Sequence, residues 1–229
     1  MRAPIVLAVD TTDLERARTW VHAARESISI IKLGLEFFLS HGQSGVEYVR
    51  GAAPDLQLFL DLKLHDIPNT VAGATRAIAQ IKPDYLTVHA SGGAPMVSAA
   101  VAELPEGKVT AVTLLTSLSE NEVSELGISG TPSEIVTKWA LGSVNAGARA
   151  IVASAHEVKS LRAILPPEIV LITPGVRPRG SDKGDQSRVA TPEEAILWGA
   201  NFVVIGRPIT SGATLEEITK NADRIASSF

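Results

Sequence analysis

Eight short runs rich in Val, Ile and Leu recur along the chain, and a longer segment of helical period follows nearly every one of them. Runs of this kind are typical of buried strands, and such segments between them are typical of amphipathic helices. The alternation therefore predicts a parallel sheet built from β-α units. The expected strands cover residues 4–10, 29–34, 56–63, 84–90, 108–115, 148–154, 168–174 and 200–206.

The number of units separates two architectures. Eight β-α units in 229 residues favour a TIM (β/α)8 barrel, for which about 250 residues is typical. An open doubly wound sheet is the alternative, because a sequence does not show whether a sheet closes. No linker interrupts the pattern, so we expect residues 1–229 to form a single domain. Helix caps are expected at Asp13, Ser133 and Thr191, with Pro192 in a first helical turn.

Composition excludes several classes of protein. The chain has no cysteine, so it has neither a disulfide framework nor a thiolate metal site. Its first apolar run is too short for a signal peptide and no run reaches membrane-spanning length, which predicts a cytoplasmic protein without a membrane partner. A net charge of -4 argues against a nucleic-acid surface.

The stretch FLDLKLHDIPNT, residues 59–70, places charges within an apolar strand. Side chains alternate along a strand, so the leucines at 56, 58, 60, 62 and 64 share one face, and Asp61 and Lys63 share the other. If the leucines pack on the helices of a barrel, Asp61 and Lys63 point inward at the carboxyl end of the strand. Barrel enzymes place their chemistry at this end, and Asp66 follows in the next loop.

A salt-bridged pair on a solvated edge strand is the simpler interpretation of these charges. Other expected strands also end in polar residues, however, and the edge-strand interpretation leaves them unexplained. They are Asp10, Lys32, His89, Thr116 and Arg207. Convergence of several polar strand ends favours a functional site.

Lysines and aspartates in one pocket would alternate in charge and keep each other ionised. At roughly 4 Å each pair interacts by about 4 kcal/mol at an effective dielectric near 20. A lysine held protonated is a poor nucleophile, but it can act as an acid and stabilise developing negative charge. The pattern favours a carbanion intermediate over Schiff-base chemistry.

A phosphate site is predicted after the last two strands. In barrels these loops commonly bind phosphate through backbone N–H groups. Here VIGRPI (204–209) offers Gly206 for close approach and Arg207 for a charge-assisted fork. The long, polar, Gly-rich connection 173–190 is expected to be a functional loop or lid.

These motifs together resemble the orotidine 5'-monophosphate decarboxylase family in its shorter bacterial form. LAVD, IKLG, DLKLHDIPNTV, TVHASGG, LLTS, TPGVRPRG, DQSR and VIGRPIT occur in the family's order over essentially the whole chain. The resemblance implies a homodimeric TIM barrel that converts orotidine 5'-monophosphate to UMP and carbon dioxide in pyrimidine biosynthesis. It also implies that no metal or organic cofactor takes part.

The resemblance further implies roles for individual residues. Lys32, Asp61 and Lys63 match the charge network of one subunit, and Asp66 matches the member from the neighbouring subunit. Lys63 would protonate C6 as the carboxylate leaves. The implied substrate contacts are Asp10 and Lys32 to the ribose, Thr70 across the dimer interface, Thr116 to the pyrimidine with Ser119 as the other candidate, and Arg177, Gln186, Gly206 and Arg207 to the phosphate and lid.

Two other functions compete with this one. The block of Asp61, Lys63 and Asp66 is also similar to that of sugar-phosphate relatives on the same fold, but these carry a magnesium-binding glutamate where this chain has Lys32, an ammonium without a lone pair. A non-catalytic phosphate sensor would need Gly206 and Arg207 but not the four charged residues. Their joint presence favours the decarboxylase.

Overall fold

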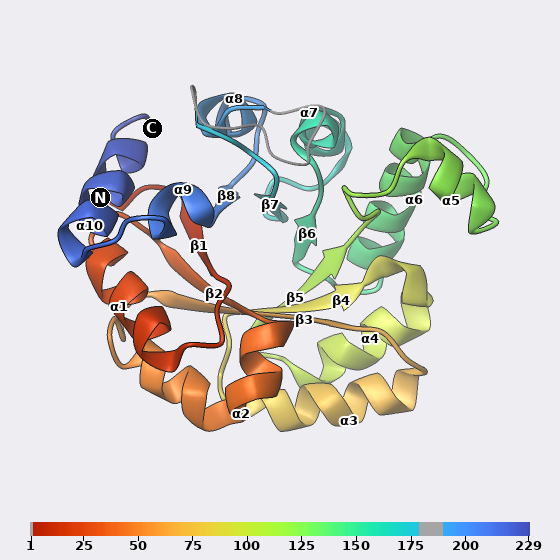
Figure 1. Ribbon diagram of the computed structural model, residues 1–229. Coiled ribbons are helices and arrows are strands. Elements are labelled where there is room, and N and C mark those ends of the chain that lie inside the picture. The colour runs from red at the N-terminus through yellow and green to blue at the C-terminus, as the bar shows by residue number, and fades with distance from the viewer. Residues whose placement is uncertain (1, 179–189) are drawn as a thin grey trace.

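The computed structural model describes residues 2–178 and 190–229. Its strands form a closed barrel in chain order, with every neighbouring pair parallel and the last strand paired to the first (Figure 1). The closure confirms the TIM barrel and rules out the open sheet. The strands are β1 Ile5–Val9, β2 Ile30–Gly34, β3 Gln57–Leu64, β4 Tyr85–His89, β5 Lys108–Val112, β6 Ala150–Val152, β7 Val170–Thr173 and β8 Phe202–Ile205.

Helices cover the outside of the barrel (Figure 1). They are α1 Leu14–Ala24, α2 Leu35–Arg50, α3 Pro68–Ala79, α4 Gly93–Glu103, α5 Glu120–Glu125, α6 Pro132–Asn145, α7 Ala155–Ile164, α8 Pro192–Leu197, α9 Arg207–Thr210 and α10 Leu215–Ala226, with a 3-10 turn at Ala90–Gly92. The short helices α5 and α9 are additions to the β-α repeat, and both follow carboxyl ends of strands.

Two of the three predicted helix caps are confirmed. Asp13 and Thr191 cap α1 and α8 with side-chain oxygens that accept backbone N–H groups. The prediction of Ser133 was wrong, because α6 begins at Pro132 and is capped by Thr131. Proline suits the first helical position, where no N–H donor is needed, so the cap falls one residue before it.

The core has two layers, and β3 contributes to both. Leu58 and Leu60 are fully buried between the barrel and its helices. Phe59 points the other way and packs inside the barrel, where the apolar layer consists of Val6, Ile30, Phe59, Tyr85, Ala150 and Ile172. The predicted alternation of β3 is therefore confirmed for this part of the strand.

The pairing of β3 with β4 becomes irregular where the charged residues begin. Leu60 pairs with Leu86 and Leu64 pairs with Val88, so residues 61–63 of β3 lie opposite Thr87 alone. Lys63 has a φ of 48°, in the left-handed region that residues other than glycine seldom adopt. The end of β3 is thus a bulge, which re-aims side chains beside active sites in many proteins.

Candidate active site

Four of the predicted residues come together at the carboxyl ends of β1, β2 and β3. Asp61 lies at the centre: its Oδ1 is 2.8 Å from the Nζ of Lys63, and its Oδ2 is 3.2 Å from the Nζ of Lys32. Lys32 also approaches Asp10, with 3.5 Å between Nζ and Oδ1. The four residues form one chain of alternating charge, which we call the charged network.

Exposure increases along the charged network from its centre toward solvent. The side chains of Lys32 and Asp61 are 10% and 13% exposed. Lys63 is 32% exposed and Asp10 is 66% exposed. Lys63 is therefore the lysine of the network whose ammonium a ligand can reach most easily.

Opposite charges keep the buried members of the network ionised. Burial raises the pKa of Asp61, but Lys32 and Lys63 outweigh burial and lower this pKa below its ordinary value. Burial lowers the pKa of Lys32, and the charges of Asp61 and Asp10 more than reverse this, so that the pKa is raised. At neutral pH Asp61 is a carboxylate and Lys32 is an ammonium.

Thr87 of β4 belongs to the same site, although it was not among the predicted residues. Its side chain is fully buried, its Oγ1 donates to Asp61 Oδ1 at 3.1 Å, and the same Oγ1 accepts from the Lys63 backbone N–H at 2.8 Å. The alternation of β4 could have indicated it, because Thr87 lies between Tyr85 and His89 on the inward face.

His89 ends β4 beside the charged network. Its ring centroid lies 5.4 Å from that of His65. Burial, followed by the nearby charges of His65 and Lys63, lowers the pKa of His89 below its ordinary value. The neutral imidazole is thus the favoured form at pH 7.

The predicted phosphate residues lie on neighbouring loops. Gly206 and Arg207 directly follow β8, whose Ile205 pairs with Leu7 of β1, so this loop borders the strand that leads to Asp10. Arg207 is exposed. Arg177 is half-buried and donates to the Val176 carbonyl at 3.0 Å. Gln186 and most of the predicted lid lie outside the described residues.

Asp66 and Thr70 are not joined to the charged network within this chain. Both are exposed, Asp66 in the loop after β3 and Thr70 in the first turn of α3. The Asp66 carboxylate accepts the N–H of Ile67 at 2.6 Å, and within residues 2–178 and 190–229 it makes no ion pair. Between them Ile67 is 66% exposed, so this stretch presents an apolar side chain to its surroundings together with the two polar ones.

Thr116 lies farther from its strand than the sequence predicted. β5 ends at Val112 rather than at residue 115, and Thr116 occupies an exposed turn before α5. Ser119, the other candidate, is the N-cap of α5, and its hydroxyl donates to Glu122 at 2.6 Å. Thr113, the residue after β5, still donates to the Val152 carbonyl from its backbone N–H at 3.2 Å and from its hydroxyl at 2.9 Å, and the loop begins beyond it.

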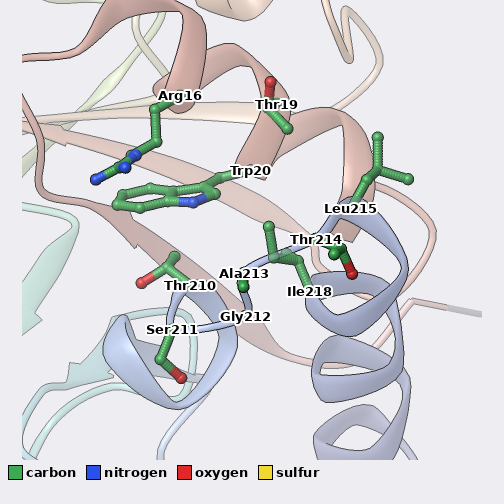
Figure 2. A pocket seen from close by; sticks show the side chains of 10 residues that line it. All are labelled: Arg16, Thr19, Trp20, Thr210, Ser211, Gly212, Ala213, Thr214, Leu215 and Ile218. Atoms are coloured by element: carbon green, nitrogen blue, oxygen red, sulfur yellow. The ribbon is translucent and has the colours of Figure 1, made fainter.

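A hollow of about 520 Å³ lies elsewhere, between α1, α9 and α10. Figure 2 shows Arg16 and Trp20 of α1 facing Thr210 and Ser211 at the end of α9. No member of the charged network lines this hollow. In the part of the chain that the structure describes, no three His, Asp or Glu side chains group as metal ligands would, and no helix is long and apolar enough to cross a membrane.

Comparisons with known proteins agree with this architecture. A family profile described as "Orotidine 5'-phosphate decarboxylase / HUMPS family" matches residues 3–221. The chain is 52% identical over 210 residues to orotidine 5'-phosphate decarboxylase of Thermobifida fusca, covering 92% of this chain and 90% of that protein. It is 44% identical over 227 residues to the enzyme of Frankia casuarinae, covering 91% and 82%.

A solved structure shows the same likeness. The crystal structure of orotidine 5'-phosphate decarboxylase from Lactobacillus acidophilus superposes with a TM-score of 0.81 at 29% identity, covering 98% of this chain and 99% of that one. The profile match and the identities to relatives of similar length together leave one assignment. The chain belongs to the orotidine 5'-phosphate decarboxylase family.

Proposed function

We propose that this protein decarboxylates orotidine 5'-monophosphate to UMP and carbon dioxide, the carboxy-lyase reaction of pyrimidine biosynthesis. Membership of the family supports the reaction. The observation that carries the mechanism is the 2.8 Å ion pair of Lys63 with Asp61, itself held by Lys32. This arrangement presents a protonated lysine at the open end of the barrel.

Lys63 is the proposed acid. When the bond from C6 to the carboxylate breaks, its electron pair stays on C6 in the plane of the ring, where the π system cannot delocalise it. A nearby ammonium stabilises this charge electrostatically and then gives C6 its proton. The electron pair becomes the new C–H bond, carbon dioxide leaves, and Lys63 regains a proton from solvent at its partly exposed end.

The other members of the network would hold Lys63 ready. Asp61 binds the Lys63 ammonium and holds it in place, and Lys32 helps to keep Asp61 ionised despite its burial. Because the groups are fixed before substrate binds, little reorganisation is needed as charge develops. Asp10 and Lys32 are also the proposed contacts to the ribose.

The remaining substrate contacts lie on the loops. We assign the phosphate to Gly206, Arg207, Arg177 and Gln186, and the pyrimidine to Thr116. Ser119 is the weaker candidate for the pyrimidine because its hydroxyl is bonded to Glu122. Phosphate is remote from C6, so its binding energy would serve to order loops and close the site, and thereby to raise kcat as well as affinity.

We propose a homodimer in which Asp66 and Thr70 complete the site of the partner subunit. Their exposure, together with that of Ile67, supports a contact surface beside the charged network.

Mixing two inactive variants tests the dimeric site directly. Asp66→Ala and Lys63→Ala proteins should each be inactive, and after subunit exchange the mixture should regain activity, because one site of each mixed dimer has both residues. A mixture that stays inactive, or a monomer by analytical ultracentrifugation, would contradict the dimeric site.

The proposed reaction needs no metal or organic cofactor and would take place in the cytoplasm.

The sugar-phosphate activities are the competing function within this fold. Lys32 disfavours them, because its ammonium occupies the space between Asp61 and Asp10 and competes with any cation there. Purified protein in chelator should form UMP from orotidine 5'-monophosphate at a rate that added Mg²⁺ does not change. Turnover of a keto-gulonate phosphate with Mg²⁺, and none of orotidine 5'-monophosphate, would refute the proposal.

A further inference from the structure

The bulge in β3 leaves backbone groups without their regular ladder partners. Asp61, Leu62 and Lys63 share the space that one residue of β4 occupies, and that residue is Thr87. Lys63 is moreover held at a positive φ, which a residue with a side chain adopts only when its surroundings enforce it. A hydrogen-bonding group beside Lys63 must therefore stabilise this backbone conformation.

The hydroxyl of Thr87 is that group. It accepts the Lys63 backbone N–H at 2.8 Å, and so supplies the acceptor that the irregular ladder lacks. Because its lone pair is engaged with this donor, its hydrogen is directed away from Lys63, toward Asp61 Oδ1 at 3.1 Å. The same Asp61 oxygen binds the Lys63 ammonium at 2.8 Å.

One hydroxyl thus fixes both ends of the Lys63 residue. It holds the backbone directly, and it holds the ammonium through the shared oxygen of Asp61. Thr87 is fully buried, so water has no access to take over either hydrogen bond. Valine has the shape of threonine but can make neither bond, whereas serine can make both.

We propose that Thr87 is a positioning residue for the decarboxylation, which sets the placement of the Lys63 ammonium relative to C6. This inference rests on the proposed function of Lys63. Misplacement of a reacting group by about 1 Å can lower a rate about 100-fold, so loss of the hydroxyl should reduce kcat on this scale. Binding should change little, because Thr87 lies beneath the charged network rather than at the phosphate loops.

The test compares Thr87→Val, Thr87→Ser and Thr110→Val with the wild type. Thr110 is a matched control: it is also a fully buried threonine, on the adjacent strand, but its hydroxyl donates to the Lys108 carbonyl and not to the network. For each protein we would measure kcat and KM for orotidine 5'-monophosphate, UMP affinity by calorimetry, and exchange of the Lys63 amide proton by NMR.

The inference predicts a kcat lower by about 100-fold in Thr87→Val, with UMP affinity kept and faster exchange of the Lys63 amide. Thr87→Ser should restore most of kcat and the slow exchange, and Thr110→Val should keep wild-type kcat. An unchanged kcat in Thr87→Val, or an equal loss in Thr110→Val, would overturn it. Absence of turnover in the wild type would instead refute the proposed function, and amide exchange would still show whether Thr87 holds Lys63.

Discussion

The interior of the barrel contains two layers that differ in chemistry although the same strands build them. The lower layer, nearer the amino ends of the strands, is the apolar layer around Phe59 and Tyr85. The upper one is the charged network with Thr87, and on β3 only one residue separates Phe59 from Asp61. The apolar layer is closed to water, whereas the charged network opens to solvent at Lys63 and Asp10, and its buried members Lys32 and Asp61 are held by ion pairs.

The comparison shows how stability and function are divided. Apolar side chains in the lower layer gain free energy from burial without needing directional partners. Charges in the upper layer lose hydration, and ion pairs recover that loss only when the geometry is good. We infer that the upper layer serves the chemistry and that the lower layer serves stability alone, so mutations in the lower layer should spare catalysis and mutations in the upper layer should not.

The largest combined effect is expected for Asp61→Ala. Its loss removes the carboxylate that both lysines share and leaves the buried Lys32 with only the exposed Asp10 as a counter-charge, so the free energy of unfolding should fall by about 3–5 kcal/mol and activity should fall with it. Urea unfolding and kcat would measure both. The ion pair of Arg76 with Glu103, 2.6 Å apart at the surface, is the control, and Glu103→Gln should lower the free energy of unfolding far less than Asp61→Ala does, because solvent screens a surface pair. Equal losses of unfolding free energy in Asp61→Ala and Glu103→Gln would contradict the distinction between buried and surface ion pairs.

Phe59→Ala should affect stability and largely spare the chemistry. Deletion of this fully buried ring leaves a cavity in the apolar layer and should lower the free energy of unfolding by about 3–5 kcal/mol. Under conditions where the variant is folded, kcat should stay within about tenfold of wild type, because no charged group loses a partner. A variant that is stable but inactive would show that the two layers are not separable.

Arg207 lies outside both layers, and Arg207→Ala should lower the catalytic rate through loss of a phosphate contact. Loss of a charge-assisted hydrogen bond to phosphate, worth about 1.5–3 kcal/mol, should lower kcat/KM by about 10- to 100-fold. Part of this loss should be in kcat, if phosphate binding helps close the site. Steady-state kinetics would separate the two constants, and an increase in KM alone would limit Arg207 to binding.

The smallest effect expected is on the pH dependence of stability. Because the pKa of Asp61 is lowered from 3.8, its contribution is present above that value and is lost as pH falls through the folded-state pKa. Because the pKa of Lys32 is raised from 10.5, its contribution is present below that value and is lost as pH rises through the folded-state pKa. The stability difference between wild type and Asp61→Asn should thus be flat near neutrality and shrink in acid. A difference that grows in acid would contradict the direction of the Asp61 shift.

The barrel could be predicted because the evidence for its strands lies in short stretches of neighbouring residues. Strand runs and their alternation are visible in consecutive residues, and Asp61 was correctly expected to face inward. The end of β5 was wrong by three residues, because an apolar run does not show where pairing with β6 stops. The expectation that Asp66 and Thr70 act across a dimer interface rests on the resemblance alone.

The bulge could not be predicted, because it depends on the register between β3 and a strand more than twenty residues away. Simple alternation placed Lys63 beside Asp61 on one face, and the structure brings their side chains together through a left-handed backbone instead. Alternation along β4 could have indicated that Thr87 faces inward, but its hydrogen bonds to Asp61 and Lys63 exist only once the two strands are paired.

The central claim is that the Lys63 ammonium stabilises and protonates C6. The most direct test is the rate of UMP formation from orotidine 5'-monophosphate by Lys63→Ala, in chelator, beside Lys220→Ala as a control for an exposed lysine. We predict a loss of about 10⁴-fold or more for Lys63→Ala with UMP still bound, and wild-type activity for Lys220→Ala. A Lys63→Ala protein that retains more than about a tenth of wild-type kcat would contradict the account.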